Sequence, residues 1–324
     1  MSYLISKDTE TLNGIKYKGR ITRKGVTIVE PVAVPDEYVG YSSSGLDMTK
    51  INDWQVYDAS EGTLIRAWFD HFANEWKLST QCKLDAYDSR WGCNATFGVM
   101  FDKDVDQYHP SLWQDMDTNY IYHYIVETRA ENRIVLVDPY GAPPQSRLIY
   151  LGRNKIGVYG VWYAAEEEPC VMSGLRRAQR VYLETWDQIE SLLPTASVGL
   201  FLRNSITSHT IKLWNEEYYE ALELRGNEPS HLRRYLFLLI TNPDCARKFL
   251  DLYSEMGVEL VQASLTFHCM MQALVFVYNS KYCSDNPPYI TVGYGLLQAI
   301  RKSHKTPPLA ALDYLFDKRH SSRE

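Results

Sequence analysis

The stretch Asp58-Ala-Ser-Glu-Gly-Thr-Leu-Ile-Arg66 decides how this chain folds. An acidic residue and a glycine, Glu61 and Gly62, come directly before a run of residues suited to a β-strand. A glycine at such a point lets the backbone turn sharply and approach a ligand closely. Three further segments follow in order along the chain: Glu131-Asn-Arg-Ile-Val-Leu136, Ser197-Val-Gly-Leu-Phe-Leu202 and Thr210-Ile-Lys-Leu-Trp214.

The composition is that of an ordinary globular protein. Of 324 residues, 45% are hydrophobic and 23% are charged, and the length favours two domains. The net charge of -6 excludes a basic surface over the whole molecule, so any nucleic-acid binding must come from a local patch. None of the six cysteines forms a C-x-x-C pair, which argues against a zinc knuckle and favours reduced thiols in a cytosol-like compartment.

We expect no membrane segment. The N-terminus has no apolar run long enough for a signal peptide, and no uninterrupted apolar stretch is long enough to cross a bilayer. The most apolar window, 258–278, contains Glu259, Gln262, His268 and Gln272. It predicts a helix buried in the protein core.

Strand signals dominate the first two-thirds of the chain. The pattern predicts strands at 26–29, 62–69, 75–80, 120–126, 133–137, 155–163, 198–202 and 210–213. The polar turn at 70–74 predicts a hairpin, and the turn at 128–132 predicts a second hairpin between 120–126 and 133–137. Short helices are expected at 110–116 and 185–193.

The pattern changes after Leu224. Arg225-Gly-Asn-Glu-Pro-Ser230 is a cluster of turn residues, and beyond it nearly every segment fits a helix. The expected helices are 231–240, 245–256, 258–281, 293–303 and 309–317. The fold class is therefore α+β, with a mixed domain at 1–224 and an all-helical C-terminal domain at 225–324.

The chain resembles the RNA ligase branch of the covalent nucleotidyltransferases, of the bacteriophage RNA ligase type, and most of all the degenerate ligase-like proteins of large DNA viruses. The resemblance rests on the 60–69 run, on Lys77-Leu-Ser-Thr80, on Glu131-Asn-Arg-Ile-Val135 and on 218–235. It covers about 25–240. It implies a nucleotidyltransferase domain built from ATP-grasp-like antiparallel sheets.

The resemblance also implies that the catalytic lysine is missing. The family pattern is Lys-x-Asp-Gly, in which a lysine of depressed pKa attacks the nucleotide α-phosphate. Ala59 stands at the lysine position, and a methyl group cannot attack phosphorus. The family glutamate on the strand before Asn-Arg-Ile-Val corresponds to Val126. Glu127 lies one residue on, a slip that turns a strand side chain to the other face.

Two further family positions are altered. The metal-side Glu-Gly pair corresponds to Val198-Gly199, which offers no oxygen ligand. The last basic motif, Lys-x-Lys, corresponds to Lys212-Leu-Trp214 and keeps one lysine. Phosphoryl-type transfer depends on positioned positive charge, so these losses argue against catalysis. Glu61, Gly62, Arg66, Glu127 and Lys212 remain as candidate nucleotide-binding residues.

Lys83 is the rival candidate for the nucleophile. Lys83-Leu-Asp-Ala86 keeps a lysine and an aspartate of the signature, but Ala86 replaces the glycine and no strand follows. A lysine that contacts phosphate or serves the structure is the alternative interpretation.

The arginines have two interpretations each. Arg66 could contact phosphate or pair with Glu61. Arg225, Arg233 and Arg234 are the best local candidates for a nucleic-acid patch, and the alternative is a set of interdomain salt bridges.

Three functions stay open at this point, and the weakest of them is a pure scaffold that has kept the fold but no binding pocket. The first is a non-catalytic protein that binds nucleotide or RNA, or that serves as an interaction or virion component in the infected host cell, with a viral protein as a candidate partner. The second is an active ATP-dependent RNA ligase that uses Lys83 and would require ATP and Mg²⁺. No metal ligand is predicted, because the eight histidines include no metal-binding pair.

Overall fold

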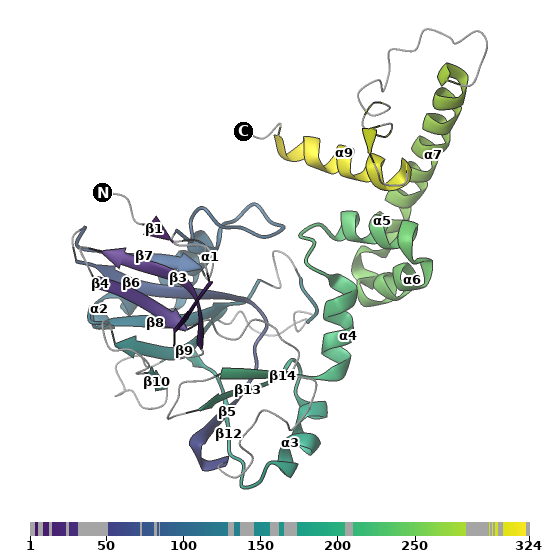
Figure 1. Cartoon of the computed structure of the whole chain (residues 1–324). Coiled ribbons are helices and arrows are strands. Elements are labelled where there is room, and N and C mark those ends of the chain that lie inside the picture. Colours follow the sequence, from purple (N-terminus) through teal and green to yellow (C-terminus); the bar gives the residue numbers. More distant parts are fainter. Residues whose placement is uncertain are drawn as a thin grey trace. The chain divides into compact units, whose positions relative to one another are not determined.

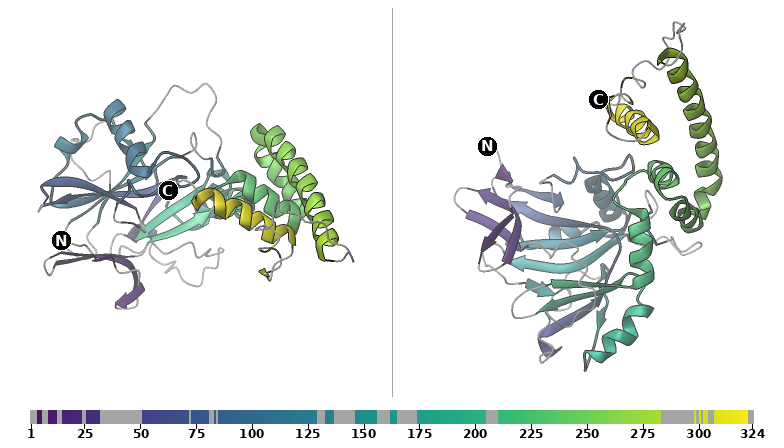
Figure 2. Two further views of the ribbon diagram at one scale, coloured as in Figure 1. Left: turned by 90° about the horizontal axis from the view of Figure 1, so that it is seen from above. Right: turned by 45° about the vertical axis from the view of Figure 1, so that its right-hand side comes forward.

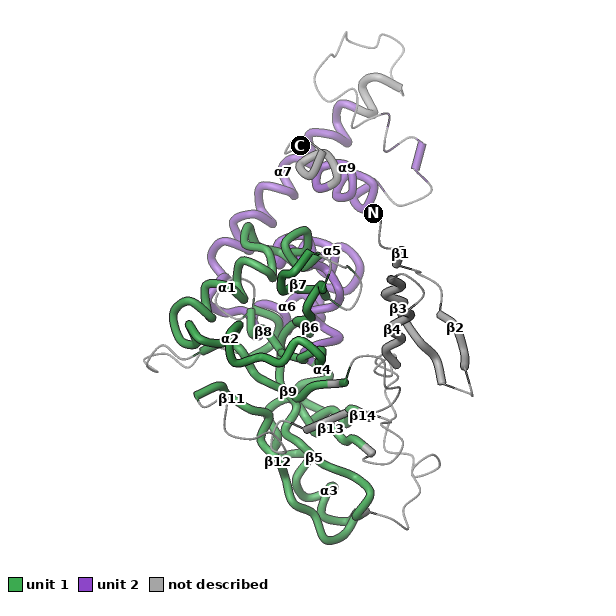
Figure 3. The backbone as a smooth tube through the Cα atoms, turned by 90° about the vertical axis from the view of Figure 1, so that its left-hand side faces the viewer, with its two compact units in different colours: residues 1–220 green, residues 221–324 purple. Residues whose placement is uncertain are grey.

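The computed structural model describes 4–5, 9–12, 15–23, 26–31, 51–71, 73–80, 83, 85–128, 133–136, 146–155, 162–164, 174–204, 210–282, 298, 300, 302–303 and 307–321. The chain divides into two compact units, Met1–Glu220 and Ala221–Glu324 (Figure 3). The sequence predicts a boundary at 224 and 225.

The largest sheet of the first unit has six strands (Figure 1). Five of them run in the order β10-β9-β8-β6-β7 with antiparallel neighbours, and β11 pairs with β9 in parallel. The strands are β6 (Thr63–Asp70), β7 (Glu75–Thr80), β8 (Tyr120–Val126), β9 (Leu148–Lys155), β10 (Trp162–Ala164) and β11 (Arg176–Arg177).

One face of this sheet forms the main core of the unit. Alternate residues of β6, β8 and β9 point to this face, as the two-residue period of a strand requires. Helices α1 (Phe97–Tyr108) and α2 (Leu112–Asp115) supply apolar partners to the same core. Phe101 of α1 meets the ring of Tyr124 edge-on, with centroids 5.2 Å apart. The Thr96 side chain caps the first turn of α1.

A smaller antiparallel sheet contains two of the segments on which the comparison with the ligase family depends, 199–202 and 210–214. Its order is β12-β5-β13-β14, with β5 (Trp54–Asp58), β12 (Arg180–Val181), β13 (Gly199–Asn204) and β14 (Thr210–Trp214). Val56, Leu200, Leu202 and Leu213 pack on one face against α3 (Asp187–Leu192) and Trp186. The short helices η1 (Ile51–Asp53) and η4 (Leu193–Thr195) adjoin this sheet in sequence.

A third sheet lies at the N-terminal end of the chain. It contains β1 (Leu4–Ile5), β2 (Thr9–Leu12), β3 (Ile15–Arg23) and β4 (Val26–Pro31). β3 pairs antiparallel with each of the other three strands. The sequence predicts only β4 of this sheet.

The second unit is helical in every element that the structure describes. Its helices are α5 (His231–Thr241), α6 (Pro243–Leu252), η5 (Ser254–Met256), α7 (Gly257–Tyr282) and α9 (Pro307–Ser321), and α4 (Glu216–Arg225) crosses the boundary between the units. α5, α6, α7 and α9 all contribute to one apolar core around Phe249, Tyr253 and Leu260. Figure 2 shows the helices of this unit in green to yellow.

The predicted α+β class with antiparallel sheets and C-terminal helices is confirmed. The hairpin β6–β7 and the strands β8, β13 and β14 lie where the sequence predicts them. The second predicted hairpin is wrong, because β8 pairs with β6 and β9, and 133–136 is a bend rather than a strand. Most of the predicted helix 293–303 and residues 156–161 of the predicted strand 155–163 lie outside the described residues.

The prediction that 258–278 forms a buried helix is half right. α7 is a helix, but Val258 is 88% exposed and Phe276 is 72% exposed. By length and composition alone, Ser254–Val277 could cross a membrane, and only 11% of its most apolar window is buried. Apolar periodicity identifies the helix, but it does not show whether the chain supplies enough neighbours to cover it.

Candidate functional site

Ala59, where the resemblance leads one to expect a lysine, is joined directly to the small sheet. Its backbone N–H donates to the carbonyl oxygen of Gly199 at 2.9 Å, and Gly199 is the cross-strand partner of Trp214. Three segments from different parts of the sequence therefore meet at one end of this sheet. The Ala59 side chain is a buried methyl group, and it brings no nucleophile to this point.

Gly62 sets the direction in which the backbone enters β6. Its φ is +149°, and a Cβ atom there would lie 2.4 Å from the carbonyl oxygen of Val126. Only glycine can adopt this backbone conformation so close to the neighbouring strand. The bend at Glu61 and Gly62 is therefore packed against the end of β8.

Glu61 is a buried carboxylate that joins three segments. Its Oε2 accepts hydrogen bonds from the N–H groups of Val135 at 3.0 Å and Leu136 at 3.1 Å, and from the Tyr218 hydroxyl at 2.9 Å. Hydrogen bonds to an ionised group are stronger than neutral ones. Glu61 therefore holds the 133–136 bend and the start of α4 in place, which explains why 133–136 is not a strand. Its second oxygen, Oε1, is buried and has no hydrogen-bond partner among the residues that the structure describes.

Lys212 and Trp214 form a stacked column with Tyr218. The Lys212 ammonium lies over the Trp214 ring, 3.7 Å from its centroid. The Tyr218 ring stacks on Trp214 with an interplanar angle of 6° and centroids 5.6 Å apart. Lys212 thus makes a cation–π contact with Trp214, the residue at which the resemblance leads one to expect a second lysine. The column connects to Glu61 through the Tyr218 hydroxyl.

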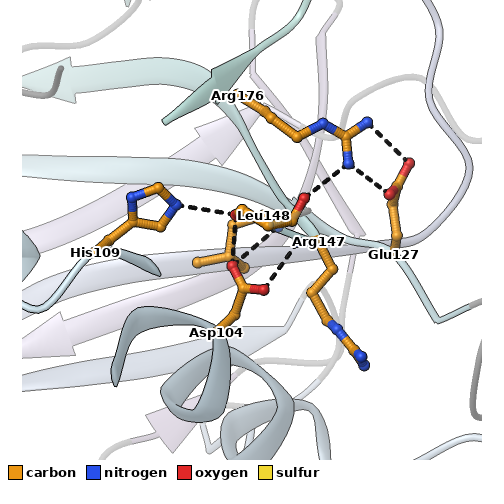
Figure 4. Close-up of polar contacts among 7 residues, drawn as sticks. Asp104, His109, Glu127, Arg147, Leu148 and Arg176 are labelled. Carbon is orange, nitrogen blue, oxygen red and sulfur yellow. Dashed lines mark hydrogen bonds and ion pairs between the residues drawn. The ribbon is translucent and has the colours of Figure 1, made fainter. Parts of the chain in front are cut away.

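Glu127 is also engaged inside the protein. Its carboxylate accepts from Arg176, with 2.7 Å between Oε2 and Nη1, and Arg176 also donates to the carbonyl oxygen of Ser146 (Figure 4). Val126, at the position expected for the family glutamate, points into the apolar core. Glu127 therefore neutralises Arg176, and Arg176 ties β11 both to the end of β8 and to the segment before β9.

The sequence gives no hint of a polar network beside this ion pair. Ser146 donates to the carboxylate of Asp104 at 2.6 Å and lies 3.0 Å from Nε2 of His109, and all three residues are buried (Figure 4). Asp104 also accepts from the N–H of Arg147 at 2.9 Å. Since the Ser146 hydroxyl gives its proton to Asp104, Nε2 of His109 must be the donor to Ser146.

This network differs from a hydrolase triad. Serine lies between histidine and aspartate, whereas a nucleophilic serine needs histidine in the middle. Burial lowers the pKa of His109, although the charge of Asp104 acts in the opposite direction. Burial thus disfavours the charged form of His109, and its hydrogen bond to Ser146 gives it a structural role. The helical spacing of Phe97, Met100 and Phe101 could have revealed α1, but nothing in the sequence pairs its Asp104 with Ser146.

Lys83 lies elsewhere, in the turn after β7. Its N–H donates to the Thr80 hydroxyl at 3.0 Å, and its exposed ammonium donates to the carbonyl oxygen of Asp88 at 2.7 Å. Neither hydrogen bond reaches the segments that meet at Ala59. Arg66 binds the same turn, because its guanidinium donates to the Thr80 carbonyl oxygen at 2.7 Å. Arg66 is buried in the six-stranded sheet, whereas Ala59 and Lys212 belong to the small sheet.

The three arginines proposed for nucleic acid serve the turn between α4 and α5. Arg225 is fully buried and donates to the carbonyl oxygens of Glu228 and Pro229, and burial lowers its pKa. Arg234 binds the carbonyl oxygens of Glu223 and Leu224, both at 2.9 Å. Arg233 pairs with Asp313 at 3.1 Å and with Glu228 at 3.4 Å. Arg225 has no exposed surface for a nucleic acid, which corrects its predicted role.

The described residues do not fit a magnesium–nucleotide site of the ligase kind. Among them, no group of three or more His, Cys, Asp or Glu side chains could hold a metal ion. Val198 is buried where the family has a metal-side carboxylate, and the Glu61 and Glu127 carboxylates already accept from other groups. No step through ATP or Mg²⁺ follows from this arrangement.

The relatives of the chain are viral. No protein-family model matches it. It is 27% identical over 228 residues to the immediate-early protein ICP-46 homolog of Invertebrate iridescent virus 6, a match that covers 65% of this chain and 49% of the relative. It is 26% identical over 201 residues to the homolog of Invertebrate iridescent virus 3, covering 60% and 42%. The chain spans about half the length of these relatives or less. The predicted kinship with proteins of large DNA viruses is confirmed.

Solved ligases are among the structures that the chain matches, with TM-scores of 0.40 and below. An archaeal ATP-dependent RNA ligase, in form 2, gives a TM-score of 0.40 at 10% identity, covering 85% of this chain and 76% of the ligase. A putative ATP-dependent DNA ligase from Aquifex aeolicus gives a TM-score of 0.39 at 13% identity, covering 85% and 77%. The geometry of the site rests on this chain's own residues.

Proposed function

We propose that the chain is a non-catalytic protein on a nucleotidyltransferase-type fold and that it acts by binding other proteins. The observation that carries the first part is the position of Ala59. Its backbone is hydrogen-bonded to Gly199, beside Trp214, where the resemblance requires a lysine nucleophile. Without an amine at this point, a lysyl-nucleotide bond cannot form there.

The neighbouring polar groups support the same proposal. Glu61 binds two backbone amides and a tyrosine, Glu127 pairs with Arg176, and Lys212 lies over Trp214. Catalysis by electrostatic stabilisation needs groups aimed at a developing charge. In this protein the contacts of these groups instead stabilise the fold.

Charge favours a protein partner over RNA. Residues 1–220 carry 22 lysines and arginines against 30 acidic residues, a net charge of -8. Nucleic-acid affinity comes mainly from basic residues that neutralise phosphates. Because the relatives are immediate-early protein homologues of iridescent viruses, we propose that the chain acts in the infected host cell with a viral protein partner, the virion being the alternative location.

The experiment is a covalent labelling assay. The protein is incubated with α-labelled ATP and Mg²⁺, denatured and run on a gel, beside the variants Lys83→Ala and Lys77→Ala. We expect no labelled band in any sample. A band in the parent protein that disappears in Lys83→Ala and persists in Lys77→Ala would overturn the proposal.

The active-ligase alternative has one observation in its favour. Lys83 is exposed, so its ammonium is accessible to a ligand. That ammonium donates to the carbonyl oxygen of Asp88.

If the gel is blank but the protein binds RNA in a salt-dependent manner, the proposed protein-binding role gives way to RNA binding.

A further inference from the structure

α7 presents an apolar stripe that the rest of the described chain leaves uncovered. The stripe consists of the exposed residues Val258, Val261, Leu265, His268, Gln272 and Val275. Phe276 lies beside it and is 72% exposed, and Leu265 is 56% exposed. Contiguous apolar surface of this kind marks an interaction site in a soluble protein.

The spacing of the stripe fits another helix. Successive members are separated by three, four, three, four and three residues, which is the a/d repeat of a coiled-coil seam. The opposite side of α7 is already used, because Leu260 and Phe267 are buried in the core of the helical unit. α7 thus has one face for its own unit and one for a partner.

The same division of faces argues against a membrane span. α7 is long and apolar enough to cross a bilayer by composition. A span would have to withdraw Leu260 and Phe267 from the core that they share with α5 and α6. The stripe also contains the polar residues His268 and Gln272, which are costly in hydrocarbon.

The chemistry of the stripe is self-complementary. Glu259 and Lys281 are the only Asp, Glu, Lys or Arg residues of α7, and neither is a stripe position. A partner recognised by charge therefore has nothing to bind. His268 and Gln272 lie at the centre, 3.0 Å apart between their side-chain nitrogens, so the polar part of the stripe has an internal partner when water is removed.

We propose that the α7 stripe is the docking site for a second copy of this chain. The proposal rests on the interaction role proposed above and names the partner. Two copies related by a two-fold axis bring identical patches together, as a seam without charge allows. The apolar residues on both sides of His268 and Gln272 would then be buried between two helices.

The area of the stripe sets the strength of the dimer. Val258, Val261, Leu265, Val275 and Phe276 are 88%, 42%, 56%, 51% and 72% exposed. At roughly 60 to 120 Å² for a fully exposed side chain of this size, they supply roughly 200 to 400 Å² per copy. A standard stable interface buries about 800 Å² per partner. The dimer is therefore expected to be weak and to depend on concentration.

The test measures the mass of the full chain by sedimentation, from about 1 to about 200 µM, the range in which a sub-standard interface associates. We expect the average mass to rise from 37.5 kDa toward twice that value. In the double variant Leu265→Glu/Val275→Glu the rise is expected to disappear. The matched control Thr266→Glu/Ala273→Glu puts the same charges on exposed α7 positions outside the stripe, and it should associate like the parent.

Three outcomes would overturn the proposal. They are a parent protein that stays monomeric at the highest concentration, a Leu265→Glu/Val275→Glu variant that still associates, and a control that loses association equally. A monomer that co-sediments with phosphatidylcholine vesicles would show that the stripe meets lipid instead. Thermal unfolding of both variants checks that they fold. The nucleotide-labelling assay is independent of α7, so the two proposals fail separately.

Discussion

At the scale of single residues, Gly62 leaves no room for a side chain. A Cβ atom would lie 2.4 Å from the Val126 carbonyl oxygen at a φ of +149°. We expect Gly62→Ala to lower the free energy of unfolding by roughly 2 to 4 kcal/mol, measured by urea denaturation. Gly174→Ala is the control, because Gly174 also has a positive φ but open space around it, and it should cost only about 1 to 2 kcal/mol. Equal losses would show that the contact with β8 is unimportant.

Tyr218 tests whether Glu61 holds the site together. Tyr218→Phe removes the hydroxyl that donates to the buried carboxylate but keeps the ring stacked on Trp214. We expect a loss of about 1 to 3 kcal/mol in the free energy of unfolding, as for hydrogen bonds to charged groups. Tyr182→Phe, at a ring that is 80% exposed, should stay within about 0.5 kcal/mol of the parent. If Tyr218→Phe leaves the free energy of unfolding unchanged, the two backbone amides alone satisfy the hydrogen-bonding capacity of the Glu61 carboxylate.

His109 makes stability depend on pH. Burial lowers its pKa in the folded protein, so the unfolded chain takes up a proton more readily as the pH falls below the ordinary value of about 6.5. The stabilisation is complete above that pH and is lost as the pH falls toward the folded-state pKa. We expect the free energy of unfolding to fall less steeply from pH 7 to 5 in His109→Gln than in the parent. If the free energy of unfolding falls equally steeply with pH in the parent and in His109→Gln, the prediction is wrong. Comparison with the parent removes the opposing effects of Asp58 and Asp102, whose pKa values are raised by burial.

At the scale of elements, helix ends show how a local signal becomes structure. The Ser230 side chain accepts from the N–H of Arg233 at 3.2 Å and caps α5, as its place in the turn cluster indicates. Ser230→Ala should lower the free energy of unfolding by about 1 kcal/mol. Ser191→Ala is the control, because the Ser191 hydroxyl donates to the carbonyl oxygen of Gln188 and caps no helix start. Thermal denaturation of the two variants compares them.

The same scale shows what the sequence could and could not predict. The alternation in β6 and β7 and the periodicity of α5 are local patterns, and both elements lie where they are expected. The 133–137 segment looks like a strand by composition, but its amides bind a carboxylate 74 residues earlier in the chain. That contact is set by tertiary structure and leaves no periodicity. The site follows the same division: Ala59 and Lys212 can be located from their motifs, but the stacking of Lys212, Trp214 and Tyr218 cannot.

At the scale of the whole molecule, the net charge supports the proposal that the partner is a protein rather than RNA. The chain carries a net charge of -6, and the arginines suggested for RNA bind carbonyl oxygens or a carboxylate within the protein. Phosphate contacts supply most of the affinity in non-specific binding, and each one steepens the salt dependence. An acidic molecule whose best basic candidates are engaged in this way has little to offer a polyanion.

We therefore expect single-stranded RNA to bind with a dissociation constant weaker than about 100 µM at physiological salt, the weak end of the non-specific range. Fluorescence anisotropy with a labelled oligonucleotide measures this. Arg233→Ala should leave the signal unchanged, since Arg233 bonds to Asp313 and Glu228. Micromolar binding that weakens with salt and falls in Arg233→Ala would show instead that the helical unit is an RNA-binding surface. The proposed dimer could produce such a surface by bringing two copies together, so the measurement is made at protein concentrations both below and above the onset of self-association.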